Sequence, residues 1–599
     1  MLSYRKLAMR VLGHPLHTGG IDSPRPASQR AAAFILTAVM LTTLAAPAFA
    51  GTWSIENGDI TVKAGETGND VTQNNVTTKN DTDTIITNSD KDTASSHTVT
   101  IETNDKNDKV EVTLDNVNIK ADSGSALTSK GDVTLTLKGD NSLTGGNGGS
   151  GISSSGSLTI SGGENNSLTA QGGSGSGIFS SGGVTISGGT VNATGGSSSG
   201  GSDSGDGIHS GSLTISGGTV TATGGSGADG SGGSGIRTFS SGGVTISGGT
   251  VNATGGTGGT GENSNGGSGI YIYSSSGSLT VSGGTVTANG GSGGGNGGDG
   301  ISSTNTTISG GSTVTANGGN GGSLVGGDGI RSGGGLTVSD GTVTAKGGNG
   351  DSKDGYGGDG IRSGGVVTIS GNTVNAAGGY GGKVGGYGIC SFDRVAISGG
   401  TVEAAGGNGS TGGGSGIYSS VIDLSGSLEL TAKAGSPNGK ALSQNGSELV
   451  LDTIKDKLGP GAKVTATDAD GKVIDQVSTP RPVEPEESSS SSDGGSSAPS
   501  APASPLPGLT VTDKDGQRIS YTSTQSGNTL TVCVGRLTAS FRISLAALRQ
   551  LRAEGIETIA FQTVLCSTTL SVDELLAMGG EDAEAVLTHR FTDSSLTVG

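Results

Sequence analysis

The chain has 599 residues, of which 121 are glycine, and it carries a formal net charge of −18. An acidic surface of this kind disfavours nucleic acid and anionic membranes as partners. The glycine content excludes a helical bundle, because glycine destabilises helix interiors, and three cysteines in so long a chain exclude a disulfide scaffold.

Residues 1–50 have the pattern of a secretory signal peptide. Five basic residues precede an apolar run at 31–46, and the segment closes with Pro47 and Ala48-Phe49-Ala50, a small-x-small cleavage pattern. The alternative is a membrane anchor, but the run is short for a bilayer and ends at a proline. We therefore expect cleavage before Gly51, a secreted or cell-surface protein, and no membrane insertion afterwards.

Between residues 51 and 110 the chain is rich in Asn, Asp and Thr, and short β-branched runs such as 59–62 and 99–101 indicate strands. This region predicts an N-terminal cap of atypical coils, because a solenoid needs a polar cover over its first core layer.

From about residue 111 one unit recurs, with a core V-T-I-S-G-G-T-V-x-A-x-G-G, a Gly-rich stretch and a closing G-I. The closing isoleucines, which we call marker isoleucines, are separated by 26 to 34 residues. A repeat of this length with one structural unit per period is typical of a solenoid. The marker isoleucines are Ile152, Ile178, Ile208, Ile236, Ile270, Ile301, Ile330, Ile361, Ile389 and Ile417.

Within each unit apolar and polar residues alternate, as in Val184-Thr185-Ile186 and Val191-Asn192-Ala193, which is the period of a strand. Gly188-Gly189 between these runs predicts a corner. Each coil should thus hold three short strands with Val, Ile and Ala inside. The prediction is an all-β, right-handed parallel β-helix over 111–455, with the length-variable Gly loops projecting from one corner; whether those loops are ordered stays open.

After the solenoid, residues 456–508 read as a degraded coil followed by a disordered Pro/Ser-rich linker. Residues 509–599 then predict a small α+β domain, with a helix from Leu545 to Glu554 capped by Ser544, a second helix at 570–578 and a last strand at 585–591. Cys533 and Cys566 both lie in this domain, either as a disulfide or as free thiols.

The runs VTLDNVNI at 112–119 and VTLTLKGDNSL at 133–143, with the DGIRS motifs at 328–332 and 359–363, resemble a known family. They are similar to the clostridial-type carbohydrate-binding parallel β-helix family of exported bacterial proteins, over residues 51–450. The resemblance implies binding of plant or cell-wall polysaccharide, bound calcium and no hydrolysis.

The residue after each marker isoleucine faces outward on the predicted coils, and several of these residues are aromatic or basic although aromatics make up only 3% of the chain. Aromatic faces stack on sugar rings, and arginine forks onto the carboxylates of acidic sugars. The alternative is that long side chains shield a strand beside glycines. The candidate carbohydrate-binding residues are Phe179, His209, Arg237, Tyr271, Arg331, Arg362 and Tyr418.

Four aspartates occupy a neighbouring column in the motif G-D-G-I: Asp206, Asp299, Asp328 and Asp359. Carboxylates at a turn are ligands that calcium accepts, so these residues are candidate calcium ligands. An aspartate can equally close an Asx-turn, and both readings stay open.

The combined prediction is a secreted, non-catalytic carbohydrate-binding protein. The alternative is a structural stalk or adhesin that presents the C-terminal domain. A polysaccharide lyase is a third reading, since Arg331 and Arg362 beside Asp328 and Asp359 approach the carboxylate-plus-base set of β-helix pectin lyases. These residues recur as repeats, however, whereas catalysis needs one unique cleft, so we expect no enzyme.

Overall fold

The computed structural model describes residues 50–103, 108–239 and 242–480, followed by parts of the C-terminal region. The predicted signal peptide up to Phe49 and the linker segment 481–507 lie outside the described residues. Contacts divide the chain into two compact units, residues 1–484 and 485–599. The described C-terminal ranges are 508–512, 518–519, 521–526, 528–534, 539–563, 567–578, 583–589 and 594–598.

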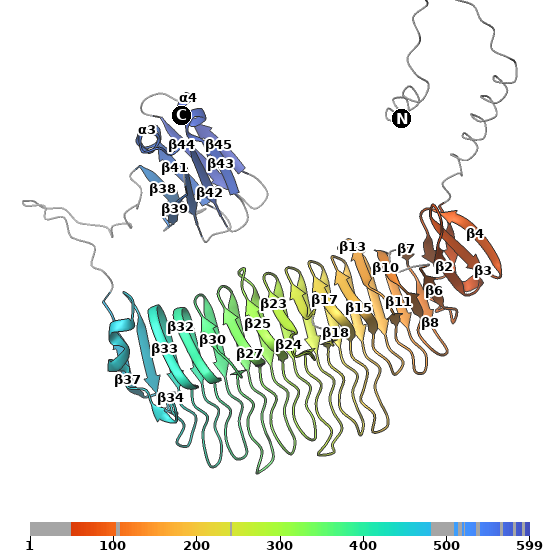
Figure 1. The fold of residues 1–599 in the computed structure, drawn as a ribbon, viewed down its shortest axis with the longest axis horizontal. Coiled ribbons are helices and arrows are strands. Elements are labelled where there is room, and N and C mark those ends of the chain that lie inside the picture. Colours follow the sequence, from red (N-terminus) through yellow and green to blue (C-terminus); the bar gives the residue numbers. More distant parts are fainter. Residues whose placement is uncertain are drawn as a thin grey trace, which may run out of the picture. The chain divides into compact units, whose positions relative to one another are not determined.

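The first unit is a parallel β-solenoid of about 15 turns, and the protein is 52% strand and 5% helix (Figure 1). This confirms the predicted all-β parallel β-helix with a small additional α+β domain. Each full coil contributes three strands, which pair in parallel with the same strands of the next coil, so the solenoid has three sheets along its length.

The first sheet holds the marker isoleucines, and its strands begin at or near them. In several coils one long strand spans the first two sheets, and the strands Ile389–Ala405 and Ile417–Lys433 span all three. The strands of the first sheet are β2 (Ile60–Ala64), β6 (Val99–Glu102), β9 (Leu127–Lys130), β12 (Ile152–Ser154), β15 (Ile178–Ile186), β17 (Ile208–Ile215), β19 (Ile236–Thr238), β22 (Ile270–Ile272), β25 (Ile301–Ile308), β27 (Ile330–Val338), β29 (Ile361–Ser363), β32 (Ile389–Ala405), β33 (Ile417–Lys433) and β34 (Leu442–Gln444).

The second and third sheets carry the V-T-I and T-V-x-A runs. The second sheet consists of β1 (Thr52–Ser54), β5 (Ile85–Thr87), β7 (Lys109–Asp115), β10 (Asp132–Lys138), β13 (Leu158–Gly162), β20 (Val244–Ile246), β23 (Ser278–Val281) and β30 (Val367–Ile369), together with the long strands. The third sheet consists of β8 (Asn118–Lys120), β11 (Asp140–Thr144), β14 (Ser167–Gln171), β16 (Thr190–Thr194), β18 (Thr219–Thr223), β21 (Thr250–Thr254), β24 (Thr285–Asn289), β26 (Thr313–Asn317), β28 (Thr342–Lys346), β31 (Thr373–Ala377), the ends of β32 and β33, and β36 (Lys463–Thr467).

The core of the barrel is a stack of aliphatic side chains. Ile178, Ile208 and Ile236 are fully buried and lie opposite one another in register, which confirms the predicted inward column. Two residues after every marker except Ile270, a small hydroxyl residue such as Ser180 or Ser332 also points inward. Several of these hydroxyls donate to backbone carbonyls, as Ser180 does to Gly156 O at 2.8 Å, so the core contains a polar column that the alternation alone did not reveal.

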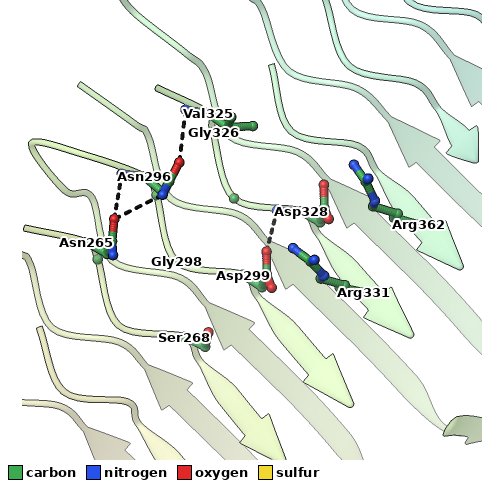
Figure 2. A pocket seen from close by; sticks show the side chains of 13 residues that line it. Asn265, Ser268, Asn296, Gly298, Asp299, Val325, Gly326, Asp328, Arg331 and Arg362 are labelled. Carbon is green, nitrogen blue, oxygen red and sulfur yellow. Dashed lines mark hydrogen bonds between the residues drawn. The ribbon is translucent and has the colours of Figure 1, made fainter. Parts of the chain in front are cut away.

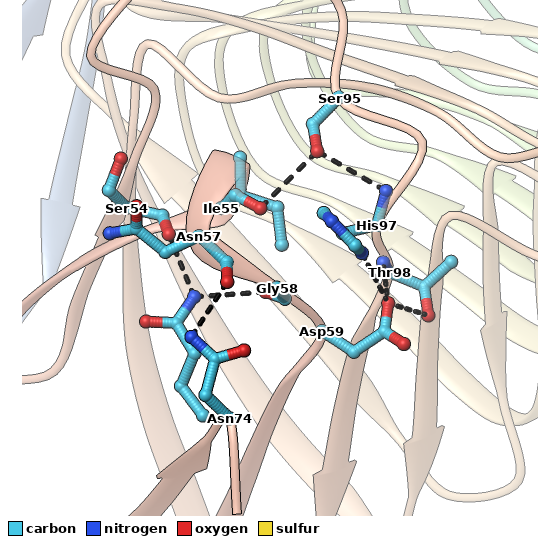
Figure 3. Close-up of polar contacts among 10 residues, drawn as sticks. Ser54, Ile55, Asn57, Gly58, Asp59, Asn74, Ser95, His97 and Thr98 are labelled. Carbon is cyan, nitrogen blue, oxygen red and sulfur yellow. Dashed lines mark hydrogen bonds and ion pairs between the residues drawn. The ribbon is translucent and has the colours of Figure 1, made fainter.

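The N-terminal end is closed by an antiparallel meander of β2, β3 (Asn69–Gln73) and β4 (Val76–Asp81), with the short helix η1 (Ile55–Asn57) beside it. Polar side chains hold this cap together, as Figure 3 shows: Asp59 Oδ1 accepts the Thr98 N–H at 2.7 Å, and Asn74 Nδ2 donates to Asn57 O at 2.7 Å. A cap of this composition covers the first core layer with a mostly polar surface, although Val76 of β4 is exposed.

The opposite end extends beyond residue 455. β36 pairs in parallel with β33, β37 (Val473–Ser478) pairs antiparallel with β36, and η2 (Leu451–Lys457) packs beside them. A hairpin, β34 with β35 (Ser447–Glu448), completes this end. The parallel stack ends at β36, whose outer edge is covered by the antiparallel strand β37. Without this cover, the backbone groups of that edge could pair with another chain.

The Gly-rich loops are ordered. Each one leaves the third sheet as an outgoing limb and returns to the next marker isoleucine as a return limb, and the loops project side by side from one edge of the solenoid (Figure 1). We call these stacked limbs the glycine slab. It comprises the loops at 195–207, 224–235, 255–269, 290–300, 318–329, 347–360, 378–388 and 406–416.

Hydrogen bonds cross the glycine slab from limb to limb. Gly291 donates to Gly267 O of the preceding return limb, Gly298 donates to Gly291 O, and Gly319 of the next coil donates to Gly298 O, each at 2.8 Å. The limbs approach so closely that a Cβ on Gly298 would lie 1.9 Å from Gly267 O. Glycine is therefore required here for packing, because only a residue without a side chain permits this approach.

The second unit has its own core around Phe541 and Phe561. Helix α3 (Leu545–Ala553) begins at Ser544, whose hydroxyl accepts the Ala547 N–H, and α4 (Val572–Ala577) begins at Ser571 in the same way. One four-stranded sheet consists of β38 (Leu509–Thr512), β41 (Ala539–Ser544), β44 (Glu584–His589) and β45 (Ser594–Val598); the other consists of β39 (Thr522–Ser526), β40 (Thr529–Cys533), β42 (Thr558–Gln562) and β43 (Ser567–Ser571).

The predicted helix at 545–554 is thus present, while the second predicted helix starts two residues later than expected, because Leu570 belongs to β43. Cys533 Sγ lies 3.2 Å from Gln562 Oε1. The other half of the candidate disulfide, Cys566, lies outside the described residues, so the pairing stays a prediction.

Candidate functional site

The residues that follow the marker isoleucines form one line along the outer surface of the first sheet. Register places Phe179 beside His209, His209 beside Arg237, and Arg237 beside Tyr271. Farther along, Arg331 lies beside Arg362, and Cys390 beside Tyr418. The structure therefore brings the seven candidate carbohydrate-binding residues into one line, which we call the marker line, interrupted by Ser302 and by Cys390.

The first half of the marker line is a cluster of aromatic side chains that also contains one arginine, Arg237. The rings of Phe179 and His209 meet edge to face with centroids 5.5 Å apart, and His209 meets Phe239 in the same way at 5.2 Å. The Arg237 guanidinium lies 5.6 Å from the centroid of Tyr271 and 6.0 Å from that of Tyr273. Such contacts hold the rings in place and leave their outer faces to solvent.

The second half carries arginines and a second aromatic pair. The Arg362 guanidinium lies 5.4 Å from the centroid of Phe392, and Tyr387 stacks on Tyr418 with centroids 4.9 Å apart. Cys390 between them is buried, and burial raises the pKa of its thiol, so the thiol stays neutral. Cys390 thus contributes packing rather than charge to this face.

Sequence reasoning missed four members of this surface. Phe239, Tyr273 and Phe392 each lie three residues after a marker isoleucine, and their exposed fractions are 38%, 62% and 54%. The signal was available, because aromatics are scarce and these three share one offset from the marker. Tyr387 replaces aspartate in the G-D-G-I column and was overlooked for that reason.

Three of the four candidate aspartates form a ladder. Asp299 Oδ1 accepts the Asp328 N–H, Asp328 Oδ1 accepts the Asp359 N–H, and Asp359 Oδ1 accepts the Tyr387 N–H, at 2.7 to 2.8 Å. Burial raises the pKa of Asp359 to about 6, and burial with the two neighbouring carboxylates raises that of Asp328 well above its usual value. The ladder thus ties successive coils together at the base of the return limbs.

The fourth aspartate lies apart from the ladder. Asp206 Oδ1 accepts the Ser234 N–H at 2.6 Å, while Oδ2 lies 3.2 Å from His209 Nδ1 and 3.9 Å from Arg237 Nη1. Burial raises the pKa of Asp206 to about 6, and burial followed by the charge of Arg237 lowers that of His209 to about 4. Asp206 therefore positions His209 and Arg237, two members of the aromatic half of the marker line.

The aspartates fit calcium poorly. Each aspartate accepts a backbone N–H of the next coil through Oδ1, so this oxygen is already engaged. Asp359 Oδ2 lies 3.6 Å from Arg362 Nη1, and the positive charge of this guanidinium would repel a metal ion. Across the described ranges no three His, Cys, Asp or Glu side chains lie close enough to hold a metal. The hydrogen bonds resemble the turn-closing alternative, and calcium binding stays a prediction.

Beside the ladder lies a pocket with a volume of about 440 Å³ (Figure 2). Its polar lining consists of Asn265, Ser268 and Asn296 on one side and of Asp299, Asp328, Arg331 and Arg362 on the other. Val325 and five backbone glycines of the slab supply the remainder. The pocket therefore joins the glycine slab to the charged half of the marker line.

No protein-family model, no curated protein and no solved structure matches this chain. Among the residues described, no helix combines the length and apolar character needed to span a bilayer.

Proposed function

We propose that the protein is a secreted, non-catalytic carbohydrate-binding protein that holds a polysaccharide along the marker line. The observation that carries this proposal is the row of aromatic and arginine side chains on one outer face, in register over successive coils and interrupted only at Ser302 and Cys390. A polymer with repeating units matches a surface that repeats at the spacing of parallel strands.

The chemistry of the row supports the proposal. Exposed rings such as Tyr273 and Phe392 offer apolar faces on which the C–H faces of sugar rings can stack. Their neighbours Arg237 and Arg362 contact the same rings and retain guanidinium donors for sugar oxygens. The acidic net charge and the signal-like segment at 1–50 agree with a partner outside the cell that is not nucleic acid.

The arginines are poorly suited to a lyase reaction. A catalytic base must be able to lose its proton. Burial lowers the pKa of Arg362, but the charges of Asp328 and Asp359 raise it, and the net shift is upward, so the guanidinium keeps its proton. The Asp–Arg pairs also recur in consecutive coils rather than in one distinct cleft. These points support a binding role without catalysis.

The test is binding to a panel of insoluble and soluble glycans, including cellulose, pectin and peptidoglycan, by pull-down and calorimetry. The double variant Tyr271→Ala, Tyr273→Ala should lose most of the binding, because it removes the centre of the aromatic cluster. The matched control is Tyr380→Ala, an exposed tyrosine in the glycine slab outside the marker line. Binding that persists in the double variant would move the site elsewhere, and a panel without any binding would refute the proposal.

A second candidate, a stalk or adhesin, is favoured by the separate core of the second unit. In that case the solenoid spaces residues 509–599 from the cell, and those residues recognise the partner. A chain ending at residue 480 distinguishes the two functions, since it should keep all glycan binding under the first proposal and lose all cell or wall binding under the second.

A further inference from the structure

The pocket beside the aspartate ladder differs from the rest of the marker line in its chemistry. The aromatic half offers flat rings, whereas this pocket offers two guanidinium groups, Arg331 and Arg362, beside the carboxylates of Asp299 and Asp328 (Figure 2). Its volume of about 440 Å³ lies within the range of small-ligand pockets. It is therefore large enough to take one unit of a polymer that runs along the solenoid.

The two arginines are not neutralised equally. Arg362 Nη1 lies 3.6 Å from Asp359 Oδ2, whereas Arg331, in the described part of the chain, has no carboxylate within ion-pair distance and is exposed. The carboxylates below are already engaged, since Asp299 and Asp328 each accept a backbone N–H through Oδ1. Arg331 therefore keeps its guanidinium donors for a bound group.

The opposite wall is rigid and partly apolar. Gly298 and Gly327 line it, and a Cβ on either would lie 1.9 Å from a backbone oxygen of the neighbouring limb, so both positions require glycine. Val325 adds an exposed apolar side chain. Asn296 Nδ2 donates to Asn265 Oδ1 at 3.1 Å, which orients both amides along the rim. This combination of a flat wall, fixed amides and guanidinium groups suits a polar ring that carries a negative group.

We propose that this pocket binds an acidic sugar unit of the polysaccharide, with the sugar carboxylate held by Arg331 and Arg362 and the ring against the glycine wall. The planar guanidinium fork matches a carboxylate through two parallel hydrogen bonds, which a neutral sugar cannot provide. The inference rests on the proposed carbohydrate binding and specifies its substrate class as uronic-acid polysaccharides.

The experiment measures calorimetric binding of the full-length protein to oligogalacturonate and to the same oligomer as its methyl ester. The free acid should bind at least about tenfold more tightly than the ester, since a charge-assisted pair contributes that much. Raising the salt concentration should weaken binding of the acid and leave that of the ester nearly unchanged.

Variants then locate the effect. Arg331→Gln should reduce acid binding about tenfold or more and spare the ester, while Arg331→Lys, which keeps the charge but not the fork, should lose a smaller part of it. Arg394→Gln, an arginine of the solenoid outside the pocket, is the matched control and should bind the acid like the wild type. Unchanged melting temperatures confirm that the variants fold.

The outcomes separate the two proposals. Equal affinity for acid and ester, or acid binding that survives both Arg331 substitutions, overturns the inference and leaves carbohydrate binding in place. If neither oligomer binds and no other glycan does, both proposals fall. If only neutral glycans bind, through the aromatic cluster, the acidic-sugar pocket is refuted alone.

Discussion

Each coil of this protein is packed in two different ways. In the barrel, three strands enclose aliphatic side chains such as Ile208 and Val220, which are fully buried. In the glycine slab, glycine predominates next to the barrel, and the limbs contact one another mainly through backbone hydrogen bonds near 2.8 Å, with asparagine side chains such as Asn296 adding further bonds between coils. Burial of apolar side chains stabilises the barrel, whereas hydrogen bonds between closely packed limbs stabilise the glycine slab. One repeat thus places an ordinary core next to a layer whose packing consists mainly of backbone.

The comparison explains where the repeat tolerates variation. The spacing between the V-T-I and T-V-x-A strands stays nearly constant, because a one-residue change would turn the inward side chains outward. The limbs next to the barrel are equally fixed, as the close contacts of Gly298 show, but the loop tips are open: a Cβ added to Gly200 or Gly201 would meet no atom within 4 Å. Differences in loop length are therefore accommodated at the tips.

The largest expected effect is in the barrel. Ile208→Ala should lower the free energy of unfolding by about 2–5 kcal/mol, because it leaves a cavity in a column that continues above and below it. Chemical denaturation followed by circular dichroism measures this. The control Thr214→Ala, on the outward face of the same strand β17, should change stability by less than about 0.5 kcal/mol. Equal effects of the two variants would mean that the stack is not the main source of stability.

A smaller loss is expected in the glycine slab. Gly298→Ala forces a methyl group against Gly267 O and should cost about 1–3 kcal/mol. It should also accelerate amide hydrogen exchange in the neighbouring limbs more than in the barrel strands. Gly200→Ala at an open tip is the control and should be neutral or slightly stabilising. A slab whose amides exchange as fast as free peptide in the wild type would contradict the ordered packing.

The ladder between the two regions should make stability depend on pH. Because the folded-state pKa of Asp359 is raised to about 6 and that of Asp328 is raised as well, their contribution to stability is complete below about pH 4 and is lost as pH rises through 6. Asp328→Asn removes one charge and keeps an oxygen for the Asp359 N–H. The variant should therefore be more stable than the wild type between pH 5 and pH 8.

Melting curves of the wild type and of Asp328→Asn across this pH range give the difference in stability between the two proteins. The contributions of the other titrating groups are common to both proteins and cancel in this difference. The groups that face Asp328 are Asp299, Asp359 and Arg362, so Arg362→Gln should steepen the pH dependence by removing a favourable charge. Parallel pH profiles for the wild type and Asp328→Asn would show that the ladder carries no unfavourable charge.

The smallest expected effect is that of calcium. Since the ladder oxygens already accept backbone N–H groups and Arg362 faces Asp359, millimolar calcium should shift the melting temperature of the wild type by about 1 °C or less. A larger rise that disappears in Asp328→Asn would instead establish a calcium site at the ladder. Magnesium at the same concentration controls for ionic strength.

Much of this architecture could be read from the repeat. The marker isoleucines, the alternation in Val184-Thr185-Ile186 and the Gly-Gly corners predicted three strands per coil and the inward columns, since a strand has only two faces and a parallel stack aligns equivalent positions. The same alignment predicted that Arg237 and Tyr271 share one outward column. For the second unit, the Ser544 cap and helix were recognisable from local signals.

Other features depended on contacts between segments that the repeat does not specify. The order of the Gly loops follows from hydrogen bonds between limbs of different coils, and glycine composition alone is compatible with a flexible chain. The burial of Asp328, and with it the raised pKa, arises because the return limbs cover the column. Periodicity along the chain therefore determined which residues share a face, whereas the approach of neighbouring coils decided what lies above each face and how its charges behave.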